Sequence, residues 1–205
     1  LGFGGPLGIA AALLHCITHG FTKALLFCIS GNVLMKYGTR DLNKISGILK
    51  TMPATGVLMS IGFFALAGFP PFAMFVSEIT GITAGVIEGQ WFVIVVFVIA
   101  LTIVVAACAH VVTQAVMGKV PEGMKKGDVS PVALIPEVVL VALILWFGVA
   151  MPQPVLNGIE QATAIVLQQD DTAALHEAPL FRDLFATTDG AHTHDQAMPP
   201  ASSSK

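Results

Sequence analysis

Three ionisable side chains recur at regular spacing within an otherwise apolar stretch of the sequence. His15, His19 and Lys23 occupy every fourth position in "HCITHGFTKALLF". At about 100° per residue they drift only about 80° around a helix, so they form a single stripe. The same sector of that helix also contains Thr18, Thr22 and Ser30.

The stripe is suited to moving protons. Ionisable side chains inside a membrane are costly and are retained mostly for function, and chains of Asp, Glu, His and Lys recur as proton relays. Histidine suits a relay because it titrates near neutral pH. Two other interpretations stay open: the polar groups tie helices together, or His15 and His19 share a metal ion. No carboxylate lies nearby in sequence to complete a metal site.

A second apolar segment, residues 54–88, is interrupted in its middle. Proline cannot donate to a helical hydrogen-bond ladder, and glycine adds flexibility. Non-helical backbone survives at membrane depth only where protein or a water-filled cavity covers it. We therefore expect a discontinuous helix made of 54–67 and 73–88. The interruption, "GFPPF", contains Gly68, Pro70 and Pro71.

Two further side chains are candidates for the same chemistry. Glu78 follows the break, and broken helices free backbone groups that help bind ions at mid-membrane; the alternative is an acid favoured by a helix N-terminus. His110 lies on a polar face of a third apolar segment, where a relay exit and an interfacial histidine fit equally well. Glu137 follows Pro136 and is expected to be an interfacial or helix-start acid.

The composition is that of an integral membrane protein. Only 11% of residues are charged, 55% are hydrophobic and the mean hydropathy is +0.80, whereas soluble domains carry about 25% charge. Several apolar runs reach the ~20 residues that a spanning helix needs. We predict an all-α integral membrane protein with about four transmembrane helices. Its segments are 7–35, the broken 54–88, 91–117 and 132–150, then an interfacial helix at 154–168 and a disordered tail at 169–205.

The charged loops predict an orientation. Lysine and arginine are enriched in cytoplasmic loops. The two lysine-bearing loops, 36–53 and 118–130, lie on one side of the membrane only if 54–88 crosses it once. This favours one broken helix over two separate crossings. It also places the C-terminal tail on the outer side of the inner (cytoplasmic) cell membrane.

Other features limit the function. The net charge of −3 and the lack of a basic block argue against nucleic acid as a partner. We find no nucleotide-binding glycine loop and no haem or iron–sulfur cysteine pattern, so we expect no cofactor, no metal centre and no redox centre of its own. The chain begins with Leu1 and shows no signal peptide. We therefore expect the C-terminal part of a longer protein.

Together these features resemble a known family. The motif H-x-x-x-H-x-x-x-K-A-L-L-F, the Gly/Pro break and "FVSE" are similar to those of the antiporter-like membrane subunits. That family includes the large ion-pumping subunits of respiratory complex I, related cation/proton antiporters and membrane-bound nickel–iron hydrogenases. The loop "VVTQAVMGKVPEGMKKGD" looks most like hydrogenase-4 component F. The resemblance covers residues 1–168.

The resemblance implies both a fold and a function. The fold has fourteen core helices in two inverted repeats, of which this chain would be the last four. Lys23 matches the family's central lysine, His15 and His19 its companion histidines, and Glu78 the Lys-or-Glu position of the second broken helix. The implied function is proton translocation in the lipid bilayer, driven by a redox reaction in neighbouring membrane and peripheral subunits. A cation/proton antiporter subunit and a purely structural subunit remain as alternatives.

Overall fold

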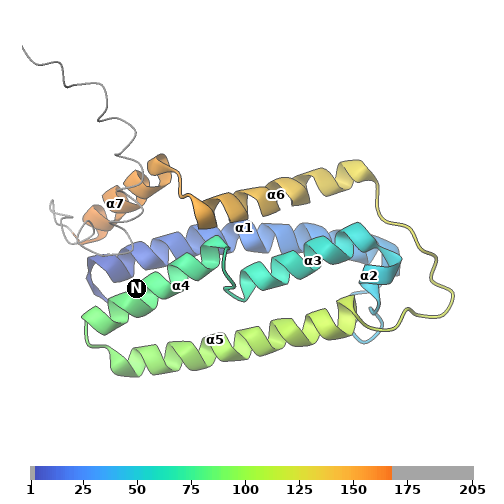
Figure 1. The fold of residues 1–205 in the computed structure, drawn as a ribbon, viewed down its shortest axis with the longest axis horizontal. Coiled ribbons are helices and arrows are strands. Elements are labelled where there is room, and N and C mark those ends of the chain that lie inside the picture. Colours follow the sequence, from blue (N-terminus) through green and yellow to red (C-terminus); the bar gives the residue numbers. More distant parts are fainter. Residues whose placement is uncertain (1–2, 168–205) are drawn as a thin grey trace, which may run out of the picture.

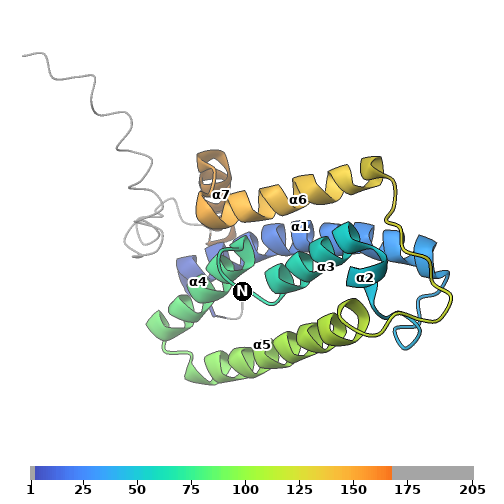
Figure 2. The same cartoon turned by 45° about the vertical axis from the view of Figure 1, so that its right-hand side comes forward.

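The computed structural model of the chain describes residues 3–167, and every regular element in that range is a helix (Figures 1 and 2). The all-α prediction is confirmed. The predicted tail at 169–205 lies outside the described residues. The helices are α1 (Gly5–Tyr37), α2 (Ile48–Thr51), α3 (Pro53–Leu66), α4 (Ala73–Ile87), α5 (Trp91–Val111), the π-helical turn η1 (Val112–Val116), α6 (Pro131–Val149) and α7 (Gln153–Leu167).

The long helix α1 forms the centre of the bundle. It packs against α3, α4, α6 and α7, and most extensively against α4. Pro6 lies in its first turn, where a missing N–H costs nothing. Gly38 ends it in the left-handed conformation, with its N–H bonded to the Leu34 carbonyl. Its apolar side chains join two buried clusters, one mainly with α3 and the other mainly with α4 and α7.

The helices α3 and α4 together cross the bundle once, with an irregular stretch between them near the middle (Figure 1). At 14 and 15 residues, each is too short to span a bilayer alone. Gly68 in the break has a φ of 68°, a conformation that favours glycine. Gly148 of α6 lies so close to the Pro71 carbonyl that a Cβ there would overlap it. This is the predicted broken helix, with its irregular backbone covered by α6.

The helix α5 lies at the edge of the bundle, against α3 and α4 (Figure 2). Most of its large apolar side chains are exposed. Within the described residues it is one of three helices, with α1 and α6, that are long and apolar enough to cross a membrane. The exposed side chains of α5 are mostly apolar, so this helix presents an apolar surface to lipid or to other apolar helices.

Both lysine-bearing loops lie at the same end of the bundle, as the single crossing requires (Figure 1). Asp128 accepts hydrogen bonds from the N–H groups of Ala54 and Thr55 at 2.7 and 3.2 Å, and from the Thr55 hydroxyl at 2.5 Å. It therefore caps α3 from a distant loop. The Gly127 N–H adds a bond to the Thr51 carbonyl at 2.9 Å. Partial burial opposes ionisation of Asp128, but its hydrogen bonds outweigh that effect and lower its pKa.

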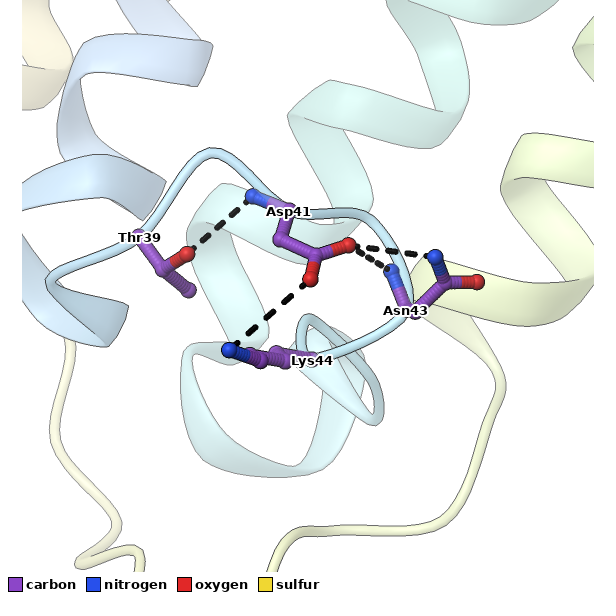
Figure 3. A network of polar contacts seen from close by, with 4 residues as sticks. All are labelled: Thr39, Asp41, Asn43 and Lys44. Carbon is purple, nitrogen blue, oxygen red and sulfur yellow. Dashed lines mark hydrogen bonds and ion pairs between the residues drawn. The ribbon is translucent and has the colours of Figure 1, made fainter.

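The loop after α1 is ordered by a small polar network (Figure 3). Asp41 accepts hydrogen bonds from the backbone and side-chain nitrogens of Asn43 at 3.0 and 3.1 Å, and its own N–H donates to the Thr39 hydroxyl at 3.1 Å. Such Asx turns fix the backbone of short loops. The Lys44 ammonium lies 3.9 Å from Asp41 and is exposed, so this ion pair adds little stability.

Candidate proton-path site

The ionisable stripe lies on α1 as its spacing predicts. His15, His19 and Lys23 are all partly buried. The rings of His15 and His19 lie 5.7 Å apart between centroids and are tilted by 31°. Lys23 continues the stripe one turn beyond His19. Three titratable groups therefore follow one another along about 12 Å of helix.

The N-terminal end of the stripe is joined to α4 by a side-chain hydrogen bond. His15 Nδ1 lies 3.0 Å from Ser77 Oγ, and Ser77 donates its only hydroxyl proton to the Met74 carbonyl at 2.7 Å. Ser77 must therefore accept from His15, so Nδ1 carries the proton in neutral His15. The second ring nitrogen, Nε2, is then the one that can accept a proton.

Glu78 follows Ser77 in α4 and is 7% exposed. Its carboxylate folds back onto the break, where a Cβ on Gly68 would overlap both carboxylate oxygens. Glycine at position 68 thus serves two purposes: it permits the left-handed backbone, and it leaves the room that the Glu78 carboxylate occupies. The Glu78 carboxylate therefore lies against the backbone of the break.

Lys23 and Glu78 do not form an ion pair in the part of the chain that the structure describes, where the salt bridge present joins Lys44 to Asp41. The His15 end of the stripe makes the hydrogen bond to the turn of α4 that bears Glu78.

The remaining polar members of the predicted stripe do not extend it. Thr18 and Thr22 are fully buried and donate to carbonyls of their own helix, those of Leu14 and Thr18, at 3.0 and 2.9 Å. Ser30 is exposed. His110 is exposed near the end of α5, and no hydrogen bond within residues 3–167 connects its side chain to the stripe.

A cavity of about 380 Å³ lies between α1, α4 and the first half of α5. His15 and Ser77 contribute its polar wall, and small residues such as Gly81 make room for it. The rest of the lining is mostly apolar, with Phe3, Ala11 and Phe97 among its residues. The cavity therefore borders the His15 end of the stripe and separates it from α5.

The structure also contains a buried polar pair that the sequence did not reveal. Glu137 of α6 is 0% exposed, and its Oε1 accepts a hydrogen bond of 2.5 Å from the Asn32 amide of α1. The expectation of an interfacial or helix-start acid was wrong, because position 137 lies on the face of α6 that packs against α1. Asn32 carried the missing signal: an amide in an apolar helix needs a partner. Within residues 3–167, no three potential metal-ligating side chains come together.

The comparisons with known proteins identify the family. The family model described as "NADH:quinone oxidoreductase/Mrp antiporter, TM" matches residues 1–104, half of the chain. The chain belongs to this family. The F(420)H(2) dehydrogenase subunit M of Methanosarcina mazei is 31% identical over 166 residues, which is 78% of this chain and 32% of that protein.

Two other relatives come from different kinds of complex. The Na(+)/H(+) antiporter subunit A1 of Staphylococcus saprophyticus is 28% identical over 89% of this chain and 24% of its own length. Formate hydrogenlyase subunit 3 of Escherichia coli is 38% identical over 35% of this chain and 12% of its own length. The chain thus spans between 12% and 32% of these three relatives.

The fold also matches a solved structure. A chain of the Mrp complex from Dietzia sp. DQ12-45-1b superposes with a TM-score of 0.67, covering 89% of this chain and 40% of that chain at 22% identity. At this identity the likeness establishes the fold and nothing further. The described residues therefore have an antiporter-like fold that corresponds to part of a larger chain.

Proposed function

We propose that this chain forms part of a proton-translocating membrane subunit, in which His15, His19, Lys23 and Glu78 carry the protons. The observation that supports this most strongly is the His15–Ser77 hydrogen bond. It joins the ionisable stripe to the turn of α4 that bears Glu78, beside the helix break. Ionisable side chains gathered at a broken helix within a membrane are typical of ion pathways.

The geometry suggests an order of transfer. A proton released by the Lys23 ammonium is taken up by His19 and then by Nε2 of His15, each donor returning to neutral as the acceptor becomes charged. His15 then gives up its Nδ1 proton on the side of Ser77, and Glu78 receives it directly or through water. The path has a second end, near the lysine-bearing loops. His110, exposed on α5, is a candidate to exchange protons there.

The family also suggests the kind of assembly in which this chain works. Relatives are subunits of multi-subunit complexes, and we propose that this chain works beside other membrane and peripheral subunits of a hydrogenase-like or complex I-like assembly. Within that class, hydrogenase-4 component F remains the particular assignment that we propose from the sequence. We also propose an inner-membrane location with the lysine loops in the cytoplasm and the C-terminal tail outside.

A second candidate is a cation/proton antiporter subunit, which the similarity to a Na(+)/H(+) antiporter subunit favours. The two differ in their driving force. Proton movement by a redox-driven subunit depends on electron transfer and does not require Na⁺, whereas an antiporter moves protons in response to an imposed cation gradient. Measuring proton flux in vesicles with each driving force applied alone separates the two.

The proposal is tested by substituting Lys23 in the full-length protein within its complex. Lys23→Ala is expected to lower the initial rate of proton translocation at least tenfold while electron transfer or cation binding is retained. Lys36→Ala is the matched control, because Lys36 lies on the same helix in its last turn, and its rate should stay within twofold of wild type. Unchanged translocation in Lys23→Ala would favour a structural role for the stripe.

A further inference from the structure

The buried pair Glu137–Asn32 lies apart from the stripe. Asn32 is nine residues beyond Lys23 on α1, about 14 Å along the axis and about 180° around the helix. Residues between them on that side of α1, such as Leu25 and Ile29, are fully buried and apolar. We infer that Glu137 and Asn32 form a second proton-binding site, which exchanges a proton independently of the stripe.

The first reason is an unpartnered oxygen. Glu137 is 0% exposed, and its Oε1 is bonded to Asn32, yet Oε2 is buried without any hydrogen-bond partner in the described structure. A buried polar atom without a partner is rare and costly, and charge makes the cost larger. A proton bound at Oε2 removes the uncompensated charge.

The second reason is the chemistry of the partner. An asparagine amide carries both a donor and an acceptor, so Asn32 can donate to the carboxylate and, with its amide turned over, accept from the carboxylic acid. A lysine or arginine in place of Asn32 would keep the Glu137 carboxyl group ionised. A cation is a poor occupant here, because the pair offers too few oxygen ligands for the six or more that hard cations take.

The third reason is the position of the pair. Asn32 lies five residues before the end of α1, and Glu137 lies six residues after the start of α6. Both are therefore about 7–9 Å from the lysine-loop end of the bundle. The titratable groups at this end include Lys36, which lies beside Gly127, and Asp128, which follows Gly127 in the loop before α6. Neither α3 nor η1 carries a titratable side chain.

The test is an infrared titration of the full-length protein in lipid vesicles. A protonated carboxyl group gives a C=O stretching band separate from that of a carboxylate. We expect a carboxyl band at neutral pH in wild type that is absent in Glu137→Gln and retained in Glu88→Gln, a matched change of an exposed acid at the end of α4. Glutamine keeps the size of the side chain and its acceptor for Asn32.

The outcomes are distinct. A carboxyl region identical in wild type and Glu137→Gln from neutral to alkaline pH would overturn the proposal, because Glu137 would then be ionised throughout. Glu137→Asp provides a second variant, in which the band should shift in position and in titration midpoint. An unshifted band would also contradict it. This measurement is independent of translocation, so loss of the stripe's function in Lys23→Ala leaves its result unchanged.

Discussion

Glu78 and Glu137 are both buried acids on apolar helices, but their surroundings differ. Glu78 lies against irregular backbone at Gly68, next to the serine that contacts His15. Glu137 lies within α6, directly after Pro136, and has one amide partner. The irregular backbone at the break leaves space around the Glu78 carboxylate, whereas Glu137 is fully buried where α6 packs against α1. The first arrangement suits transfer of a proton to the stripe, and the second suits a proton-binding site separate from it.

The largest effect on stability is expected at the break. Gly68→Ala forces a side chain into a left-handed backbone position and into the space of the Glu78 carboxylate. We expect a loss of about 3 kcal/mol in the free energy of unfolding, measured by thermal unfolding in detergent. Gly20→Ala is the control, because a Cβ at Gly20 of α1 meets nothing within 4 Å, and it should be neutral or stabilising. Equal stability in the two variants would mean that Glu78 is not confined by the break.

A smaller loss of stability is expected when the hydrogen-bond partner of Glu137 is removed. Asn32→Leu keeps the apolar packing of α1 but removes the donor to Glu137, leaving the buried carboxyl without a partner. We expect a loss of about 2 kcal/mol. Gln161→Leu, at an exposed position of α7, is the control. If Asn32→Leu is as stable as wild type, the amide is not what accommodates Glu137.

The comparison also shows what sequence can reveal. Glu78 was found because the break around Gly68, Pro70 and Pro71 is a local pattern, and the i, i+4 spacing of His15 and His19 is another. The contact between Asn32 and Glu137 joins residues 105 positions apart, and no local pattern specifies which face of α6 meets α1. Asp128 was missed for the same reason, because its role as a cap depends on how a loop folds back onto α3.

The Asp128 cap joins the loop before α6, the helix of Glu137, to the start of α3, the helix that precedes the break. It therefore links the two regions that hold the buried acids. Asp128→Ala is expected to cost about 1 kcal/mol, a value typical of helix caps. Because the pKa of Asp128 is lowered in the folded state, its stabilisation is complete above its unfolded pKa of about 3.9 and is lost as pH falls through the lower folded value. The wild type should lose this increment on acidification and Asp128→Ala should not, with Glu122→Gln as the control.

The smallest effect concerns the link between the stripe and α4. Ser77→Ala removes the acceptor for His15 Nδ1 and should cost about 0.5–1 kcal/mol. Ser60→Ala is a suitable control, since Ser60 bonds only to a carbonyl of its own helix. Ser77→Ala should also slow proton translocation more than Ser60→Ala does. Equal proton-translocation rates in the two variants would show that Ser77 has no part in the proton path.

The proton-translocation rate of Glu78→Gln, measured in vesicles containing the full-length protein and its complex, tests the central claim most directly. Glu88→Gln, at the exposed end of the same helix, is measured beside it. If protons pass from the stripe to the break, Glu78→Gln lowers the rate at least tenfold while Glu88→Gln remains within twofold of wild type. Wild-type translocation in Glu78→Gln would contradict a proton path through the helix break.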